Sequence, residues 1–176
     1  MRLDKFANSG FDRGASRFKE ILWICCQGIC FGSWLPGSKW RCMMLRAFGA
    51  KVGHGVVIKP HVKVKFPWRL SIGNYSWIGE GVWIDNLAAV TIEEHVCVSQ
   101  GVYVCTGNHD WTDPAFGLIT QPVIIQSGAW IGAQSTVCPG CVVESGAVLP
   151  VRSIAAGTYA GNLVHLRDGS TKPRRS

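Results

Sequence analysis

Aliphatic residues recur at six-residue intervals through most of this 176-residue chain. The members of this six-residue series are Ile72, Ile78, Ile84, Ile92, Val98, Val104, Ile125, Ile131, Val137, Val143 and Leu149. A two-residue slip follows Ile84, and a longer interruption follows Val104. A period of six matches neither a helix nor a single strand. It predicts short strands joined by bends, with three strands in each turn of a solenoid and an aliphatic column inside.

Two further regularities support a solenoid. Small or β-branched residues stand two places before several members of the series, namely Val82, Val102, Ala129, Ser135, Cys141 and Ala147. Gly often follows the aliphatic residue, where its missing Cβ would relieve crowding at a bend. An antiparallel sandwich would instead show alternation within strands and turns every 8 to 12 residues. The expected class is therefore mainly β, with a single-stranded parallel β-helix.

The first 50 residues lack this rhythm. Apolar spacing predicts a helix over 17–29 that stops at 35–37, and a second short helix over 40–48. The apolar run 21–31 is too short to span a bilayer. With basic residues before it, the first helix either contacts a membrane surface, or it caps the end of the coil or packs on a neighbouring subunit. We favour a packing role, on the coil or on a neighbouring subunit.

These patterns divide the chain into three parts. They are an N-terminal helical extension over 1–50, a β-helix over 51–166 with a loop inserted at about 105–122, and a basic tail over 167–176. Apolar residues make up 47% and charged residues 16%, which argues against disorder. The net charge of +7 favours anionic ligands or surfaces. Because the basic residues are scattered and no nucleic-acid-binding motif appears, we expect no nucleic-acid partner.

The eight cysteines bear on location and metal binding. The N-terminus has no apolar signal region, so we expect a cytoplasmic protein with reduced thiols. The pair Cys138 and Cys141 has the spacing of half a zinc site, but nothing in the sequence completes it. We therefore expect buried cysteines that act as small hydrophobic residues, and no metal.

The interruption reads CTGNHDWTDPAF, residues 105–116, and contains one histidine, His109. A neutral imidazole can take a proton from a hydroxyl group near pH 7. Asp110 or Asp113 either orients this histidine or caps a turn. Loops that leave a rigid scaffold often carry function, so His109 is the candidate catalytic residue.

Several segments resemble a known family. They are FDRGASRFKEILW, LRAFGAKVG, PWRLSIGNYSWIGEGVWIDNLAAVTI, VSQGVYVCTGNHDWTDPAF and GAWIGAQSTVCPGCVVESGAVL. With them the chain resembles the hexapeptide-repeat acyltransferases, within the branch that serves exopolysaccharide (colanic acid) biosynthesis. The resemblance implies a left-handed β-helix, contrary to the usual crossover hand. It also implies a homotrimer with sites between neighbouring subunits, acetyl-CoA as donor, a sugar hydroxyl as acceptor, and His109 as general base for direct attack.

The same resemblance suggests acceptor-binding residues. Asp85 and Asn86 stand where the repeat expects Gly, and they either line the acceptor pocket, bond the loop histidine or form a turn. Asp110 and Trp111 are candidate acceptor contacts from the loop, although Trp111 would also serve to anchor it. A lipid-linked acceptor would suit the apolar N-terminal helix and a location at the inner face of the membrane.

Donor-binding residues are expected farther along the chain. Trp130, Gly132 and Ala133 match the strand beside the pantetheine arm, where a backbone amide could stabilise the oxyanion. Trp130 would alternatively pack in the trimer. Arg152 and Arg167 are candidate phosphate contacts.

The region after Leu149 departs from the family pattern. In PVRSIAAGTYAGNLVHLR, which follows Leu149, the expected Thr-Lys pair is missing, and Gly161-Asn162 is followed by Leu163 instead of Pro. This departure keeps open a trimeric scaffold that has lost its donor site and does not catalyse. Apart from it, a second alternative is a γ-type carbonic anhydrase on the same fold. The second would need three histidines to converge on zinc.

Overall fold

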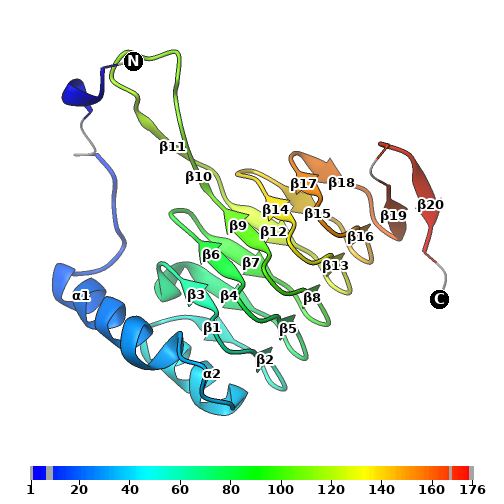
Figure 1. Cartoon of the computed structure of the whole chain (residues 1–176), viewed down its shortest axis with the longest axis horizontal. Helices are drawn as coiled ribbons and strands as arrows, with labels where there is room; N and C mark the ends of the chain where they lie inside the picture. Colours follow the sequence, from blue (N-terminus) through cyan, green and yellow to red (C-terminus); the bar gives the residue numbers. More distant parts are fainter. Residues whose placement is uncertain (1, 7–9, 167, 175–176) are drawn as a thin grey trace.

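The computed structural model describes residues 2–6, 10–166 and 168–174, and it is a stack of three-sided coils (Figure 1). Each full coil adds one strand to each of three parallel sheets. The first sheet contains β1 (Lys51–Val52), β4 (Leu70–Ile72), β7 (Val90–Ile92), β12 (Val123–Ile125), β15 (Val142–Val143) and β18 (Thr158–Tyr159). The second contains β2 (Val57–Ile58), β5 (Trp77–Ile78), β8 (Cys97–Val98), β13 (Trp130–Ile131), β16 (Val148–Leu149) and β19 (Leu163–His165), and a last strand, β20 (Thr171–Pro173), pairs with β19 in antiparallel fashion. The third contains β3 (Lys63–Val64), β6 (Trp83–Asp85), β9 (Tyr103–Cys105), β14 (Thr136–Val137) and β17 (Ile154–Ala155).

The six-residue series forms the core, as predicted. Every member exposes 3% or less of its surface. The small or β-branched residues that stand two places before members of the series, such as Val82 and Ala147, expose 1% or less. Strands align in register, so that Ile72 lies beside Ile92 and Ile84 beside Val104. Burial of each Val or Ile side chain contributes about 1.5–3 kcal/mol, which makes this column the main source of stability. The mainly β class and the parallel solenoid are confirmed.

Glycine is required where stacked coils approach each other. A Cβ on Gly73 would lie 2.5 Å from the backbone of Glu93 and Glu94 in the next coil. A Cβ on Gly132 would lie 2.5 Å from Pro150 C and Val151 N. The glycine that follows an aliphatic residue therefore permits the spacing between coils, which matches the crowding argument from the sequence.

Two helices cover the N-terminal end of the stack. Helix α1 (Arg17–Cys26) begins at the Ser16 side chain, continues as the π-helix η2 (Gln27–Phe31), and is followed by α2 (Ser38–Ala47). Trp23 and Phe31 are fully buried, and Trp23 Nε1 donates a hydrogen bond of 2.7 Å to the carbonyl of Val64. The helices thus pack against the first coil through these residues. Two shorter helices are η1 (Leu3–Lys5) and η3 (Pro67–Arg69).

The connection between the helices is tied to one buried arginine. The Arg41 guanidinium is fully buried and donates to four backbone carbonyls, those of Phe31, Ser33, Leu35 and Gly37. Burial lowers the pKa of Arg41 from its ordinary value. Because the four hydrogen bonds all end on backbone carbonyl oxygens of this connection, the guanidinium fixes the connection between η2 and α2 in one conformation. Within the parts of the chain that the structure describes, no helix is long and apolar enough to cross a membrane.

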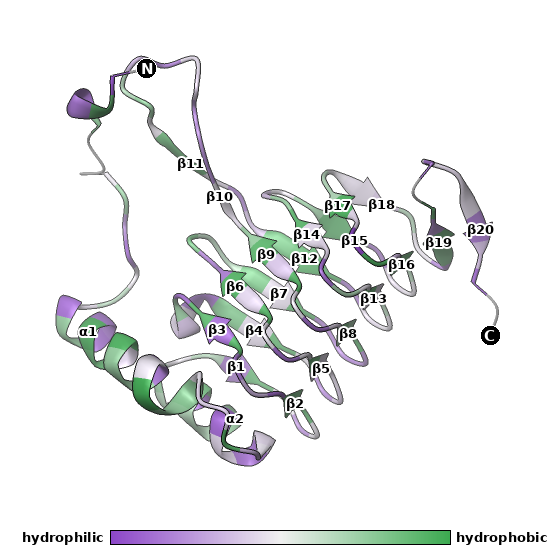
Figure 2. Cartoon of the chain, in the orientation of Figure 1, coloured by the Kyte–Doolittle hydropathy of each residue, from purple (hydrophilic) through white to green (hydrophobic). Residues whose placement is uncertain are grey.

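The cysteines depart from the expectation that they are buried. Only Cys42 and Cys141 are buried, whereas Cys25 and Cys30 are exposed and the others are half-buried. The apolar character of the helical run explains the difference, because α1 carries apolar residues on its outer side as well. Hydrophobic residues occur on both helices and in the coils (Figure 2).

Candidate functional site

The polar interruption leaves the solenoid as a β-hairpin. Strands β10 (Gly107–His109) and β11 (Leu118–Thr120) pair in antiparallel fashion between β9 and β12 and project away from the coils (Figure 1). His109 lies opposite Leu118, and Gly107 lies opposite Thr120. Paired residues point to the same side of a ribbon, so His109 shares a face with Leu118 and Thr120.

The imidazole of His109 is held in one orientation. Its Nδ1 lies 2.9 Å from the backbone carbonyl oxygen of Phe116, which can only accept a hydrogen bond. Nδ1 therefore carries the proton, and Nε2 presents its lone pair. The ring stacks on Phe116 with centroids 4.4 Å apart and an interplanar angle of 1°. The edge of Phe6 packs against it at 5.6 Å.

The partner of His109 was not predicted from the sequence. Phe116 has a φ of +53°, in the left-handed region that non-glycine residues seldom adopt. Its N–H donates to the carbonyl of Asp113 at 2.9 Å, which closes the turn that aims the Phe116 carbonyl at the imidazole. A main-chain carbonyl leaves no sequence signal of its own, so side-chain carboxylates were the candidates.

The two aspartates of the hairpin cap turns. Asp110 Oδ1 accepts from the hydroxyl of Thr112 at 2.6 Å and from the Thr112 N–H at 2.9 Å. These bonds, the hydroxyl first, lower the pKa of Asp110. Asp113 Oδ1 accepts from the N–H of Ala115 at 2.9 Å. The turn-capping alternative therefore describes both, whereas Trp111 at the tip is 78% exposed.

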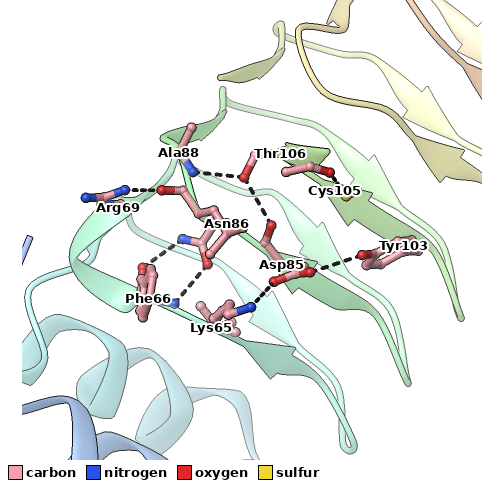
Figure 3. A network of polar contacts seen from close by, with 12 residues as sticks. Lys65, Phe66, Arg69, Asp85, Asn86, Ala88, Tyr103, Cys105 and Thr106 are labelled. Carbon is pink, nitrogen blue, oxygen red and sulfur yellow. Dashed lines mark hydrogen bonds and ion pairs between the residues drawn. The ribbon is translucent and has the colours of Figure 1, made fainter. Parts of the chain in front are cut away.

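Asp85 anchors a polar network near the base of the hairpin (Figure 3). Its Oδ1 lies 3.0 Å from Lys65 Nζ, and its Oδ2 accepts from the Tyr103 hydroxyl at 3.1 Å. Burial, followed by the neighbouring Cys105 and Asp85, raises the pKa of Tyr103. The Tyr103 hydroxyl therefore stays protonated and acts as a donor. The backbone carbonyl of Asp85 also accepts from the Thr106 hydroxyl at 3.1 Å.

Asn86 has a different position. It is fully buried, and its Oδ1 accepts from the Phe66 N–H at 2.9 Å while its Nδ2 donates to the Phe66 carbonyl at 2.7 Å. Figure 3 shows the side chain reaching from its own coil to the preceding one. This geometry makes Asn86 a clamp between coils. It does not fit the expected contact with an acceptor, because the amide is enclosed and occupied.

The expected donor residues lie on two sides of a later coil. Trp130 is 49% exposed, and its Nε1 donates to Ser99 Oγ at 2.9 Å. The N–H of Gly132 donates to the Leu149 carbonyl at 2.8 Å, so this amide belongs to the coil ladder and is not free for an oxyanion. The backbone carbonyl of Ala133 accepts from the N–H of Arg152 at 2.8 Å.

The basic candidates are separated from His109 in the chain fold. Arg152 is exposed, and its Nε donates to Gln134 Oε1 at 2.8 Å. It lines a cavity of about 410 Å³ together with Tyr159 and His165. Arg167 lies outside the described residues.

A second cavity lies beside the hairpin. It has a volume of about 560 Å³ and is lined by Gly10, Phe11, Asp12, Arg69, Gly117, Leu118 and Thr120. Leu118 and Thr120 belong to the face that carries His109. The N-terminal segment thus forms one wall and the β10–β11 hairpin the other. The segment also contacts the hairpin tip, where the Arg2 N–H donates to the Pro114 carbonyl at 2.8 Å.

In the part of the chain that the structure describes, the side chains near the cysteines do not form a metal site. Among residues 2–6, 10–166 and 168–174, no cluster of three or more His, Cys, Asp or Glu side chains could hold a metal ion. Burial, followed by the neighbouring Cys138, raises the pKa of Cys141 to about 12. That thiol is protonated at neutral pH, which is unsuited to a metal ligand.

The sequence is similar to named bacterial proteins. It is 37% identical over 154 residues to the putative colanic acid biosynthesis acetyltransferase WcaF of Escherichia coli (strain K12), covering 86% of this chain and 84% of the relative. It is 31% identical over 121 residues to nodulation protein L of Rhizobium leguminosarum bv. viciae, covering 62% of this chain and 63% of the relative. No protein-family model matches the sequence.

Solved structures share the fold. A hexapeptide-repeat acetyltransferase from Vibrio cholerae O1 biovar eltor, complexed with acetyl coenzyme A, superposes with a TM-score of 0.77 at 20% identity, covering 99% of this chain and 97% of the other. A galactoside acetyltransferase in complex with coenzyme A has a TM-score of 0.74 at 20% identity, covering 83% and 74%. These likenesses establish the left-handed β-helix that was expected.

Proposed function

The chain belongs to the family of hexapeptide-repeat acetyltransferases that includes WcaF, and we propose that it transfers an acetyl group from acetyl-CoA to a sugar hydroxyl. One observation carries the catalytic part of the proposal. His109 is held through Nδ1 by the Phe116 carbonyl, and its Nε2 is left to accept a proton. The donor is inferred from the structural neighbours that contain acetyl-CoA or CoA. The sugar acceptor is inferred from WcaF and the galactoside acetyltransferase.

The proposed reaction is a direct transfer. Nε2 of His109 removes the hydroxyl proton as the sugar oxygen attacks the thioester carbonyl carbon. The tetrahedral intermediate then collapses, the carbon–sulfur bond breaks, and the imidazolium returns its proton to the departing thiolate. The Phe116 carbonyl stabilises the imidazolium through the Nδ1 hydrogen bond. General base catalysis of this kind contributes about 10²- to 10⁴-fold in rate.

We place the acceptor in the cavity between the N-terminal segment and the hairpin. Its wall offers an aromatic ring at Phe11, charged groups at Asp12 and Arg69, and the hydroxyl of Thr120. Rings and polar groups together suit the two kinds of surface on a sugar. Asp85 and Trp111 stay proposed acceptor contacts. Asp85 has a charged carboxylate beside the hairpin base, and Trp111 has an exposed ring.

A homotrimer with sites between subunits is part of the proposal. Trp77, Trp83 and Trp130 project from the outer faces of the second and third sheets and are 45–52% exposed. Large aromatic side chains on a rigid surface are typical of contacts between subunits. Trp130, Ala133 and Arg152 are the residues we assign to the donor. We also propose a role in exopolysaccharide synthesis in the cytoplasm, which the likeness to WcaF supports.

The decisive experiment compares His109→Ala with His54→Ala, a surface histidine in the first coil. We expect His109→Ala to lose about 10²- to 10⁴-fold in kcat toward a panel of sugars, and His54→Ala to remain near wild type. Both variants should keep the trimer and the stabilisation by acetyl-CoA, which is about 2.7 kcal/mol at a hundredfold excess over Kd. Near-normal turnover by His109→Ala would refute its role as the base. Absence of stabilisation by acetyl-CoA in the wild type would instead favour another acyl donor or the non-catalytic scaffold.

A further inference from the structure

The helical cap has a large apolar surface on the side away from the coils. We call this the outer apolar face, and it comprises Phe18, Ile21, Leu22, Ile24, Ile29 and Trp34. Their exposed fractions run from 45% for Leu22 to 77% for Phe18 and Ile29. Figure 2 shows the hydrophobic colour along α1, which lies at the edge of the molecule. Scattered apolar residues are normal on a surface, but a contiguous group marks a binding surface.

The side of these helices that faces the coils is buried against them. Trp23, Phe31 and Leu45 expose 0% of their surface, and the Gln27 side chain accepts from the Val64 N–H at 2.6 Å. The coils therefore account for one side of α1 only. No charged residue occurs between Ile21 and Phe31, so this part of the helical run carries apolar side chains on its outer side as well as on its inner side. A helix of that kind is covered by something on each side.

Charge indicates what covers the outer side. Between residues 13 and 47 the sequence has six Lys or Arg residues and one acidic residue, Glu20, whose carboxylate pairs with Arg13. Arg17, at the start of α1, and Lys39, at the start of α2, are exposed. Basic groups at the border of an apolar helix face are the pattern of helices that lie at an anionic lipid surface. A face-to-face contact with a second copy would instead bring these like charges together.

The length of the uncharged helical run determines how it can contact a bilayer. A helix rises about 1.5 Å per residue, so the uncharged run over 21–31 extends only about half of the roughly 30 Å hydrocarbon core. It can therefore lie in the interface but not cross it. Trp34 is 72% exposed in the connection after η2, and Trp is favoured at the headgroup level of membranes. The Arg41 contacts keep this connection in place beside α1.

We propose that the outer apolar face binds the surface of a bilayer that contains anionic phospholipid. In this arrangement α1 lies parallel to the membrane plane. Ile21, Leu22 and Ile29 enter the boundary between headgroups and acyl chains, and Arg17 and Lys39 contact lipid phosphates. This inference is independent of the proposed reaction, since it concerns the opposite side of the helices from the coils and uses no residue of the hairpin.

The test is co-sedimentation of the full chain with vesicles of equal parts phosphatidylglycerol and phosphatidylcholine, compared with vesicles of phosphatidylcholine alone. We expect binding to the anionic vesicles only, and weaker binding as salt is raised. Ile29→Ser should weaken binding about tenfold, and Ile21→Ser with Ile29→Ser by about a hundredfold, because each side chain loses its burial in lipid. The matched control is Ile154→Ser on β17, since Ile154 is 76% exposed and Ile29 is 77% exposed.

Thermal melting and light scattering accompany each variant. Unchanged melting and mass together with lost sedimentation support the proposal. It is overturned if the wild type sediments with neither vesicle or equally with both, or if the double variant binds like Ile154→Ser. A lower mass for Ile29→Ser would also overturn it, because a second copy of the chain would then be what covers this face.

Discussion

Replacement of Asn86 by Ala separates two accounts of the same residue. Sequence position suggests an acceptor contact, whereas the structure shows a buried clamp on Phe66. In Asn86→Ala the Phe66 N–H loses its hydrogen bond inside the protein, at a cost of about 1–3 kcal/mol. The Phe66 carbonyl still accepts from the Arg69 N–H at 2.9 Å, so its loss is only about 1 kcal/mol. The expected destabilisation is therefore about 2–4 kcal/mol.

For a chain of this size such a loss lowers Tm by about 5–15 °C. Circular dichroism melting measures that change, and the acceptor KM is measured below both transitions, where it should stay near wild type. Asp85→Ala is the neighbouring comparison, because its partly exposed ion pair with Lys65 contributes about 1 kcal/mol or less. An unchanged Tm with a raised acceptor KM in Asn86→Ala would show that the amide meets the sugar, and the clamp account would be wrong.

Asn86→Asp adds a pH dependence with a definite sign. The buried carboxylate faces the Phe66 carbonyl, so its folded pKa should lie above the unfolded value near 4. The protonated form can donate to that carbonyl, and the ionised form cannot. The variant should therefore lose the least stability at pH values below the unfolded pKa and more as pH rises through the folded pKa. Melting curves from pH 4 to 8 relative to wild type measure this trend, and a flat difference would contradict it.

Two further predictions concern the coils and the thiols. Gly132→Ala should destabilise the protein by about 1–3 kcal/mol, because the new Cβ would lie 2.5 Å from the backbone of the next coil, whereas Gly28→Ala meets nothing within 4 Å and should leave Tm the same or higher. Equal Tm values would contradict the stacking argument. Iodoacetamide at pH 8 should label the exposed Cys25 and Cys30 of the native protein well before the buried Cys141, whose pKa is about 12. Mass spectrometry of peptides gives the order, and early labelling of Cys141 would show that the coil opens.

The interior of the solenoid was predictable because one physical requirement repeats along the chain. Each coil must bury an aliphatic side chain on each of its three sides, so Ile72, Ile78 and Ile84 recur every six residues. Residues of successive coils, such as Ile78 and Val98, then stack in one sheet. The helical cap was predicted less sharply. The regular helix ends at Cys26 instead of residue 29 and continues as a π-helix, and α2 begins at Ser38. Apolar spacing does not distinguish these helix types at a helix end.

The site was harder to predict because it depends on main-chain geometry. His109 was identifiable as the histidine of the interruption, but its partner is a carbonyl whose direction results from the left-handed conformation of Phe116. Residue types report side-chain chemistry, so Asp110 and Asp113 seemed the better partners. Their carboxylates instead accept hydrogen bonds from backbone N–H groups in the turn of the hairpin. The wall formed by Phe11 joins segments about a hundred residues apart, which no local pattern reveals.

Asp85 and Asn86 are neighbours in the sequence, but one side chain faces outward and the other is buried in the coil. Side chains alternate along a strand, so the two neighbours at the end of β6 point to opposite sides. Asp85 faces outward with Lys65 and Tyr103, and 15% of its side chain is exposed (Figure 3). Asn86 turns inward, where the corner of the coil leaves the Phe66 N–H without a strand partner and an amide side chain supplies one. A polar pair that interrupts the repeat therefore has two causes, and only the outward member is available for recognition.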